Sequence, residues 1–112
     1  MESKTLAKDI VNLIDDKKGE NIVCFHIGNY SSLADYFIIA TGNVDTHVKA
    51  IAENMTVELK KHNIAPLAHE GTGEGNWVCV DYGDVIVHIM RKQERDFYSL
   101  ESIWGGCPKE TF

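Results

Sequence analysis

The sequence predicts an α/β protein, with a mixed sheet flanked by helices. Some segments repeat apolar residues every three or four positions, as one-sided helices do, whereas others are apolar throughout or alternate as strands do. Their order is helix, strand, strand, helix, strand, hairpin, helix, which fits an α/β or α+β domain. With 112 residues, the chain has the length of one domain. We expect a single domain over residues 1–104 and a flexible C-terminal tail over residues 105–112.

The first helix is predicted to follow Ser3, a candidate N-cap. Leu6, Ile10 and Ile14 recur at helical spacing on its apolar face. Gly19 supplies the C-terminal stop, and two lysines before it suit the negative end of the helix dipole.

Two strands and a second helix follow. Residues 21–27 have the composition of a strand, and residues 36–40 form a continuous apolar run ended by Gly42. Such a run indicates a strand covered on both faces. Asp45, or alternatively Asn43, is the expected N-cap of the second helix. Its apolar stripe consists of Val48, Ile51, Ala52, Met55 and Leu59.

A glycine series separates a weak strand, ending at Glu70, from the last part of the chain. Gly71, Gly73 and Gly75 could be read as a phosphate cradle, which would have to follow a strand and open a helix. Here the series precedes a strand, and Glu70 and Glu74 would repel phosphate. We therefore interpret it as a flexible loop.

The C-terminal third predicts a hairpin and a terminal helix. Residues 77–82 and 85–90 are strands joined at Gly83 and Asp84, a typical tight-turn pair. In the second strand, odd-numbered positions should face one side and even-numbered positions the other. Residues 91–104 are expected to form one or two short helices.

Charge and composition exclude several classes of function. The net charge of −6 argues against phosphate-dominated binding, so we expect little direct nucleic-acid contact. If the protein works near RNA, the expected contact is a basic protein. No apolar run could span a membrane, and the N-terminus enters a helical pattern without a signal peptide. A cytoplasmic location is the expectation. Three widely spaced cysteines indicate neither a disulfide framework nor a zinc site.

Catalytic and metal-binding motifs are lacking. No two of the five histidines have a short metal-ligand spacing, and His88 beside Asp81 and Asp84 is the only local cluster. Glu94 and Asp96 should diverge on a helix. We expect no catalytic residue, no metal and no cofactor, and hence no enzyme. A nucleotidyltransferase-type enzyme is the alternative from another class.

Large amphipathic residues gather near the C-terminal end. Trp, Tyr and Arg are over-represented at interface hot spots, so one face built from the hairpin and the terminal helix is predicted to bind a protein. The alternative is that these side chains fill a small core, and for Phe97 we favour that alternative. The cluster consists of Trp77, Tyr82, Arg95, Phe97, Tyr98 and Trp104.

Taken together, these segments resemble the ribosomal silencing factor (Iojap-like) family. The match is collinear from about residue 3 to residue 104, and its most specific part is DYGDVIVH followed by RDFYSLE. The segments that carry the resemblance are residues 32–42 (SLADYFIIATG), 48–52, 70–71, 77–78, 81–88 and 95–101, with Trp104. The chain departs from the common pattern at Thr46 and His47, where many relatives carry an arginine.

The resemblance implies a nucleotidyltransferase-like fold without catalytic acids. It further implies binding to the large ribosomal subunit through its ribosomal protein fourteen, which blocks joining of the small subunit and lowers translation when nutrients are scarce. Some members are linked instead to large-subunit assembly, and free relatives are often dimeric, so a homodimer is a further expectation. The implied partner is thus a ribosomal protein rather than a membrane.

By matched position, the resemblance also implies an interface. Acidic Asp81, Asp84 and Glu101 would complement a basic ribosomal protein and speed encounter, while apolar and aromatic contacts would set most of the affinity. The predicted protein-interface residues are Trp77, Asp81, Tyr82, Asp84, His88, Arg95, Phe97, Tyr98, Leu100, Glu101 and Trp104.

Overall fold

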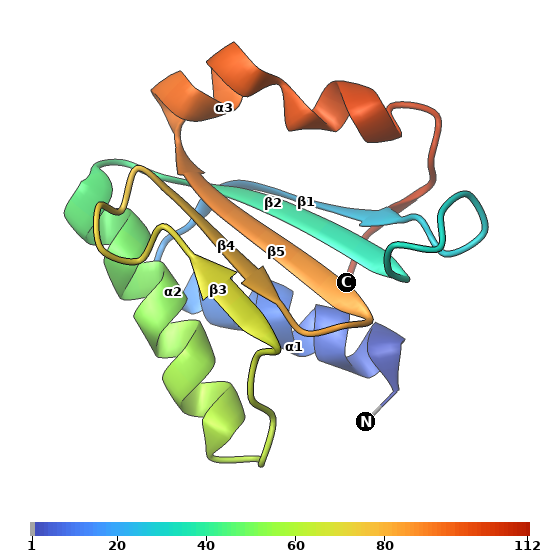
Figure 1. The fold of residues 1–112 in the computed structure, drawn as a ribbon, viewed down its shortest axis with the longest axis horizontal. Helices are drawn as coiled ribbons and strands as arrows, with labels where there is room; N and C mark the ends of the chain where they lie inside the picture. The colour runs from blue at the N-terminus through green and yellow to red at the C-terminus, as the bar shows by residue number, and fades with distance from the viewer. Residues whose placement is uncertain (1) are drawn as a thin grey trace.

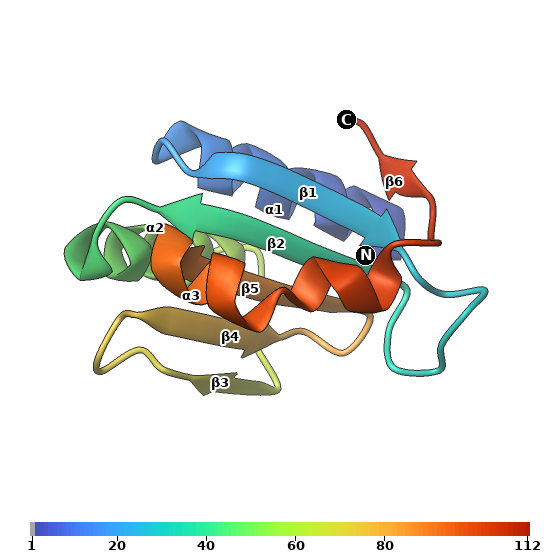
Figure 2. The ribbon, with the colours of Figure 1, turned by 90° about the horizontal axis from the view of Figure 1, so that it is seen from above.

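A six-stranded sheet in the order β3-β4-β5-β2-β1-β6 organises the protein in a computed structural model that describes residues 2–112. Figures 1 and 2 show the sheet between two helical layers. Its strands are β1 (Glu20–His26), β2 (Tyr36–Gly42), β3 (Ala68–Glu70), β4 (Trp77–Asp81), β5 (Val85–Arg91) and β6 (Lys109–Glu110). The helices are α1 (Ser3–Asp16), α2 (Asp45–Lys60), the short α3 (Lys92–Tyr98) and the 3₁₀ helix η1 (Leu100–Trp104). The predicted mixed sheet with flanking helices is confirmed.

The two central strands are parallel, and the other pairs are antiparallel. β2 pairs with β5 from Tyr36 opposite Val85 to Gly42 opposite Arg91. Every residue of β2 is buried, as its continuous apolar run predicts. The hairpin of β4 and β5 also forms as predicted, closed by the Tyr82 N–H donating to the Val85 carbonyl at 2.9 Å.

The sheet carries a core on each face. α1 and α2 cover one face, whereas α3 and η1 lie on the other (Figure 1). β5 shows how one strand serves both. Val85, Val87 and Ile89 point into the α1–α2 core, and Ile86 and Met90 point into the core beneath η1, as the alternation predicts.

The helix starts differ from the predicted caps. Glu2 occupies the N-cap position of α1, and Val44 that of α2, and neither side chain caps the helix. Asp45 is instead the first helical residue, and its Oδ1 accepts a hydrogen bond from the Thr46 N–H at 2.9 Å. Asn43 contributes its backbone N–H to His47 Nδ1 rather than a capping side chain.

His47 links the start of α2 to the end of α1. Its Nδ1 accepts from the Asn43 N–H at 2.8 Å, and its Nε2 lies 2.7 Å from the Lys17 carbonyl oxygen, to which it donates. His47 is one of the two positions at which this chain departs from the common family pattern. Its side chain therefore links the end of α1 to the start of α2.

The C-terminal segment, expected to be a flexible tail, contains β6 at the edge of the sheet. Lys109 lies opposite Phe25 of β1, and the His26 N–H donates to the Pro108 carbonyl at 2.8 Å. An edge strand presents unpaired backbone groups, and the tail satisfies some of those of β1.

The glycine series between β3 and β4 is closely fitted rather than open. Gly71 has a φ of +83°, and a Cβ there would lie 1.9 Å from the Trp77 carbonyl oxygen. Gly75 has a φ of +77°, and a Cβ there would lie 2.7 Å from the Asp45 carbonyl oxygen. Of the three glycines in this series, only Gly73 faces open space. These close contacts thus constrain the backbone of the loop that leads into β4.

No helix within residues 2–112 is long and apolar enough to cross a membrane.

Candidate protein-binding surface

The second core, beneath α3 and η1, supports the predicted interface. Its buried part comes from three strands and the loop between β1 and β2, and its partly buried rim includes three predicted interface residues, Trp77, Leu100 and Trp104. The buried residues are Phe25, Ile27, Ala34, Phe37, Ile39, Ile86 and Met90, and those packed against them include Trp77, Cys79, Leu100, Trp104 and Cys107. Predicted site residues from β4 and η1 are therefore brought together.

A continuous chain of aromatic rings runs from this core to the surface. The Phe37 ring stacks on His88 at 4.8 Å and meets Trp104 at 5.3 Å between centroids. Trp77 lies 5.8 Å from His88 and 4.8 Å from Tyr98, and Tyr98 contacts Phe97 edge-on at 5.0 Å. Such tilted and edge-on contacts add to the stability gained from buried area. The exposed rings of Phe97 and Tyr98 are therefore connected through Trp77 to the partly buried His88.

His88 orients Trp77. The Trp77 Nε1–H donates to His88 Nδ1 at 2.8 Å, which requires an unprotonated Nδ1 and places the ring hydrogen on Nε2, 3.8 Å from the Cys79 sulfur. Burial lowers the pKa of His88 to about 4, because the charged imidazolium would lose its hydration. Burial, followed by the charge of Asp81, raises the pKa of the Cys79 thiol. Both side chains are therefore neutral at pH 7.

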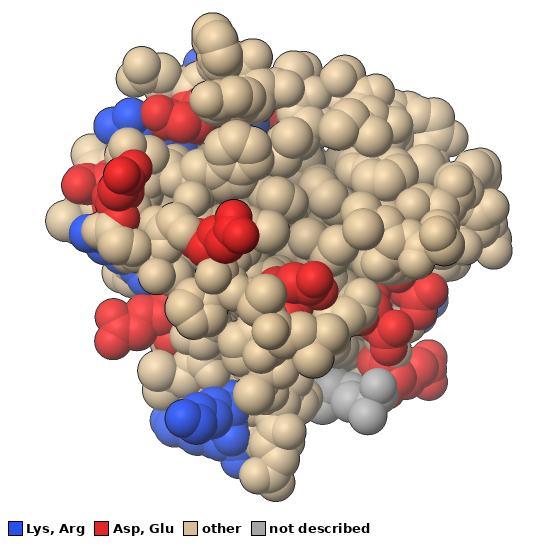
Figure 3. All heavy atoms as spheres, viewed as in Figure 1, with Lys and Arg blue, Asp and Glu red and all other residues tan. Residues whose placement is uncertain are grey.

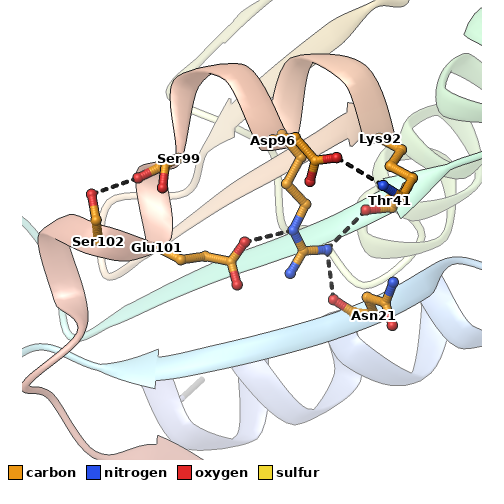
Figure 4. A network of polar contacts seen from close by, with 8 residues as sticks. Asn21, Thr41, Lys92, Asp96, Ser99, Glu101 and Ser102 are labelled. Atoms are coloured by element: carbon orange, nitrogen blue, oxygen red, sulfur yellow. Dashed lines mark hydrogen bonds and ion pairs between the residues drawn. The ribbon is translucent and has the colours of Figure 1, made fainter.

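Arg95 anchors α3 to the sheet, and Figure 4 labels its three hydrogen-bond partners Asn21, Thr41 and Glu101. Its side chain is buried, at 8% exposure, although Arg95 was predicted to contact a partner. One guanidinium nitrogen donates to the Asn21 carbonyl at 2.7 Å and to Thr41 Oγ1 at 2.8 Å, and Nε donates to Glu101 at 2.7 Å. Hydrogen bonding to Arg95 lowers the pKa of Glu101. Arg95 and Glu101 thus position the helices that carry the surface.

Three large apolar side chains remain exposed on this layer: Phe97 at 79%, Tyr98 at 54% and Ile103 at 64%. We call these three residues the α3 surface. The preference for Phe97 as a core residue was wrong, because the short α3 turns that side chain away from the sheet. Ile103 was missed, since it falls outside the helical spacing of residues 97, 100 and 104. An apolar residue off the expected stripe was the available signal.

The remaining predicted positions lie elsewhere. Tyr82 packs against the α1–α2 core, on the opposite side of the sheet, and burial raises its pKa to about 12. Asp81 Oδ1 accepts from the Gly83 N–H at 2.7 Å, and Asp84 is exposed on the hairpin turn. Glu101 is paired with Arg95, so the three acids lie in different local surroundings.

The same geometry bears on catalysis. Glu94 pairs with Arg91 and Asp96 with Lys92, so these two acids diverge as their helical spacing predicts. Across residues 2–112, no group of three or more His, Cys, Asp or Glu side chains is placed to hold a metal ion. What the arrangement offers is exposed apolar side chains on two short helices, the first of which Arg95 joins to the sheet.

Comparison with known proteins gives a consistent result. The family described as "Ribosomal silencing factor during starvation" matches residues 1–112. The ribosomal silencing factor RsfS of Bacillus subtilis is 40% identical over 108 residues, covering 96% of this chain and 92% of that protein. A crystal structure of a Chromobacterium violaceum protein superposes with a TM-score of 0.91 at 38% identity, covering 100% of this chain and 92% of that one.

A more distant relative is a mouse protein named "Mitochondrial assembly of ribosomal large subunit protein 1". It is 28% identical over 98 residues, which cover 85% of this chain and 43% of the mouse protein. Its name associates that protein with assembly of the large subunit.

Proposed function

The chain belongs to the ribosomal silencing factor family, and from that premise we propose that it binds the large ribosomal subunit and blocks joining of the small subunit. We propose ribosomal protein fourteen as the contact, with lowered translation under nutrient limitation as the result and the bacterial cytoplasm as the place of action. The protein would act by occupying a surface and not by catalysis.

The observation that carries this proposal is the α3 surface. Phe97, Tyr98 and Ile103 are large, apolar and exposed on a layer that Arg95 and the aromatic chain hold in place. Pre-positioned aromatic side chains lose little conformational entropy on binding, and they dominate the energy of many interfaces. We therefore place the centre of the interface on α3 and η1, with Trp77 and Trp104 beneath it.

Charge has a smaller role in this proposal than the sequence suggested. Of the three acids expected to face a basic partner, Asp84 alone is both exposed and outside the hydrogen bonds described above. Asp84 and the net charge of −6 would favour encounter with a basic ribosomal protein, chiefly through the association rate.

Sedimentation of mixed ribosomal subunits tests the proposal. Purified small and large subunits are combined at a magnesium concentration that permits joining, with and without the protein. We expect the protein to migrate with the large subunit and the joined-ribosome peak to shrink. If the protein migrates with no ribosomal particle, the proposal fails.

A second candidate, a large-subunit assembly factor, is favoured by the mouse relative. It predicts binding to the large subunit without loss of joining, and immature large subunits in a deletion strain. A third candidate, a nucleotidyltransferase-type enzyme, predicts a rise in melting temperature with nucleotide and magnesium.

We also propose that the free protein forms a homodimer through the α3 surface, since a second copy would shield the same exposed side chains. Sedimentation velocity over a range of concentrations would then show a dimer that Phe97→Ala weakens. A monomer at all concentrations would contradict this proposal.

A further inference from the structure

A groove lies on the α2 side of the sheet, on the face opposite to the α3 surface. Its volume is about 490 Å³, and it runs between α2 and the edge of the sheet formed by β3 and β4. Small-molecule sites usually enclose roughly 300–1,000 Å³ and are mostly apolar with a few polar groups. The lining residues are Lys49, Ala52, Glu53, Thr56, Val57, Lys60, Pro66, His69, Thr72, Val78 and Val80.

One continuous face of α2 forms a wall of this groove. Its six lining residues occupy positions i, i+3, i+4, i+7, i+8 and i+11 from Lys49, which is one stripe of a helix. Eleven residues of helix rise about 16 Å. Lys49 and Lys60 therefore stand near the two ends of an elongated groove.

The floor of the groove is apolar. Val78 and Val80 of β4 and Ala52 of α2 lie directly beneath it, and because they are buried in the α1–α2 core they present almost no surface of their own. Val57, with 47% of its surface exposed, and Pro66 continue the apolar lining toward solvent. Trp77 and Cys79 alternate with these valines and face the other side of β4, so the groove is separate from the α3 surface.

Two lysines and one acid are the charged residues that line the groove, in a chain whose net charge is −6. The lysines are Lys49 and Lys60, and the acid is Glu53. His69 of β3 also lines the groove. Within the described part of the chain neither lysine forms an ion pair. Figure 3 shows basic side chains gathered over the C-terminal end of α2, at the lower left of the view.

We propose that this groove binds a small amphipathic anion. The apolar body of the ligand lies against Val57 and Pro66. Its carboxylate, sulfonate or phosphate is held by Lys49 or Lys60. A charged hydrogen bond from a lysine is stronger than a neutral one and is strengthened beside an apolar floor. The site does not depend on ribosome binding, because it lies on the other face of the sheet.

The probe 8-anilinonaphthalene-1-sulfonate combines aromatic rings with one anionic group and suits this test. We expect saturable binding to the native protein, with ¹H–¹⁵N shift changes centred on Ala52, Val57 and His69. The neutral analogue N-phenyl-1-naphthylamine should bind at least tenfold more weakly, because it lacks the anion.

Variants separate the groove from other apolar surfaces. The double variant Lys49→Gln, Lys60→Gln should weaken binding of the sulfonate at least tenfold. Lys61→Gln removes a neighbouring charge that pairs with Glu58 and does not line the groove, and it should leave binding unchanged. Val57→Asp, at a half-exposed wall position, gives a second route to the same loss.

The proposal is overturned if the shift changes centre on Phe97, Tyr98 and Ile103, or if the folded double variant binds the sulfonate as the wild type does. It is also overturned if Phe97→Ala abolishes binding. Circular dichroism of each variant establishes that the fold is intact, so that lost binding reports on the groove.

Discussion

The indole Nε1–H of Trp77 donates a 2.8 Å hydrogen bond to Nδ1 of His88 across β4 and β5, and this bond requires an unprotonated Nδ1. The fold therefore accepts only a neutral His88, whose pKa falls to about 4. Because Trp77 in turn supports Tyr98, the protonation of one histidine bears on the layer that carries the exposed aromatic side chains.

Stability should fall as the pH is lowered through the histidine range. An unfolded histidine has a pKa near 6.5. Between about pH 6.5 and pH 4, His88 is therefore protonated in the unfolded chain but neutral in the folded protein. The stabilising contribution of neutral His88 is complete above that range and is lost on the way down to pH 4. From pH 7.5 to pH 4.5, the free energy of unfolding should fall by about 2 kcal/mol more in the wild type than in His88→Asn.

Urea denaturation at several pH values measures this difference. Other acidic groups titrate in the same range, so the readout is the difference between the two pH profiles rather than either profile alone. His62→Asn, at an exposed position after α2, should keep the wild-type profile. Parallel profiles for wild type and His88→Asn would show that His88 is not the titrating group.

Replacing Arg95 should loosen the whole C-terminal layer. Arg95→Met leaves the Asn21 carbonyl, Thr41 Oγ1 and the Glu101 carboxylate without their shared donor. Of these, Thr41 is buried, and a buried group left unpaired is costly. We expect a loss of about 2–4 kcal/mol in the free energy of unfolding. Amide hydrogen exchange should also become faster in α3 and η1.

Lys92→Met is the matched control, since Lys92 lies on the same helix and pairs with Asp96 in solvent. An exposed pair of this kind contributes little, so the variant should unfold close to the wild type. Equal free energies of unfolding for Arg95→Met and Lys92→Met would show that Arg95 does not anchor α3 to the sheet.

The sequence predicted elements better than it predicted the contacts between them. Periodicity is local, and the strand pattern at residues 85–90 identifies which side chains face each core. The placement of Arg95 depends on residues far away in sequence, because its guanidinium reaches Asn21 and Thr41, 74 and 54 positions earlier. No local pattern encodes those contacts, so a helix-face arginine was interpreted as a partner contact.

Two further residues show the same limit. Tyr82 follows directly after β4, where alternation sends it to the face opposite Asp81 and Trp77, yet proximity in sequence grouped it with them. Phe97 is exposed because α3 is short and is followed by Ser99 in a left-handed conformation, with a φ of +48°. That bend ends the helical spacing from which a buried Phe97 was inferred.

The glycine series allows a test within one loop. Gly71→Ala should cost at least about 2 kcal/mol, because the residue needs a positive φ and its Cβ would clash with the Trp77 carbonyl oxygen. Gly73→Ala meets no atom within 4 Å, and should be neutral or stabilising by up to about 1 kcal/mol. Urea midpoints of the two variants decide the matter, and a tolerated Gly71→Ala would mean that the loop is not fitted as described.

Binding should depend on Phe97 far more than folding does. Phe97 is the most exposed side chain of the α3 surface, so Phe97→Ala removes little core packing and should change the free energy of unfolding by less than about 0.5 kcal/mol. If the α3 surface is the centre of the interface, the same change should raise the Kd for the large subunit about 5- to 30-fold, which corresponds to about 1–2 kcal/mol. Leu67→Ala, at a residue 76% exposed beside the hairpin turn, removes an equally exposed apolar side chain outside this surface and should bind as the wild type does. Equal Kd values for Phe97→Ala and Leu67→Ala, measured by co-sedimentation at fixed salt, would place the interface elsewhere on the molecule.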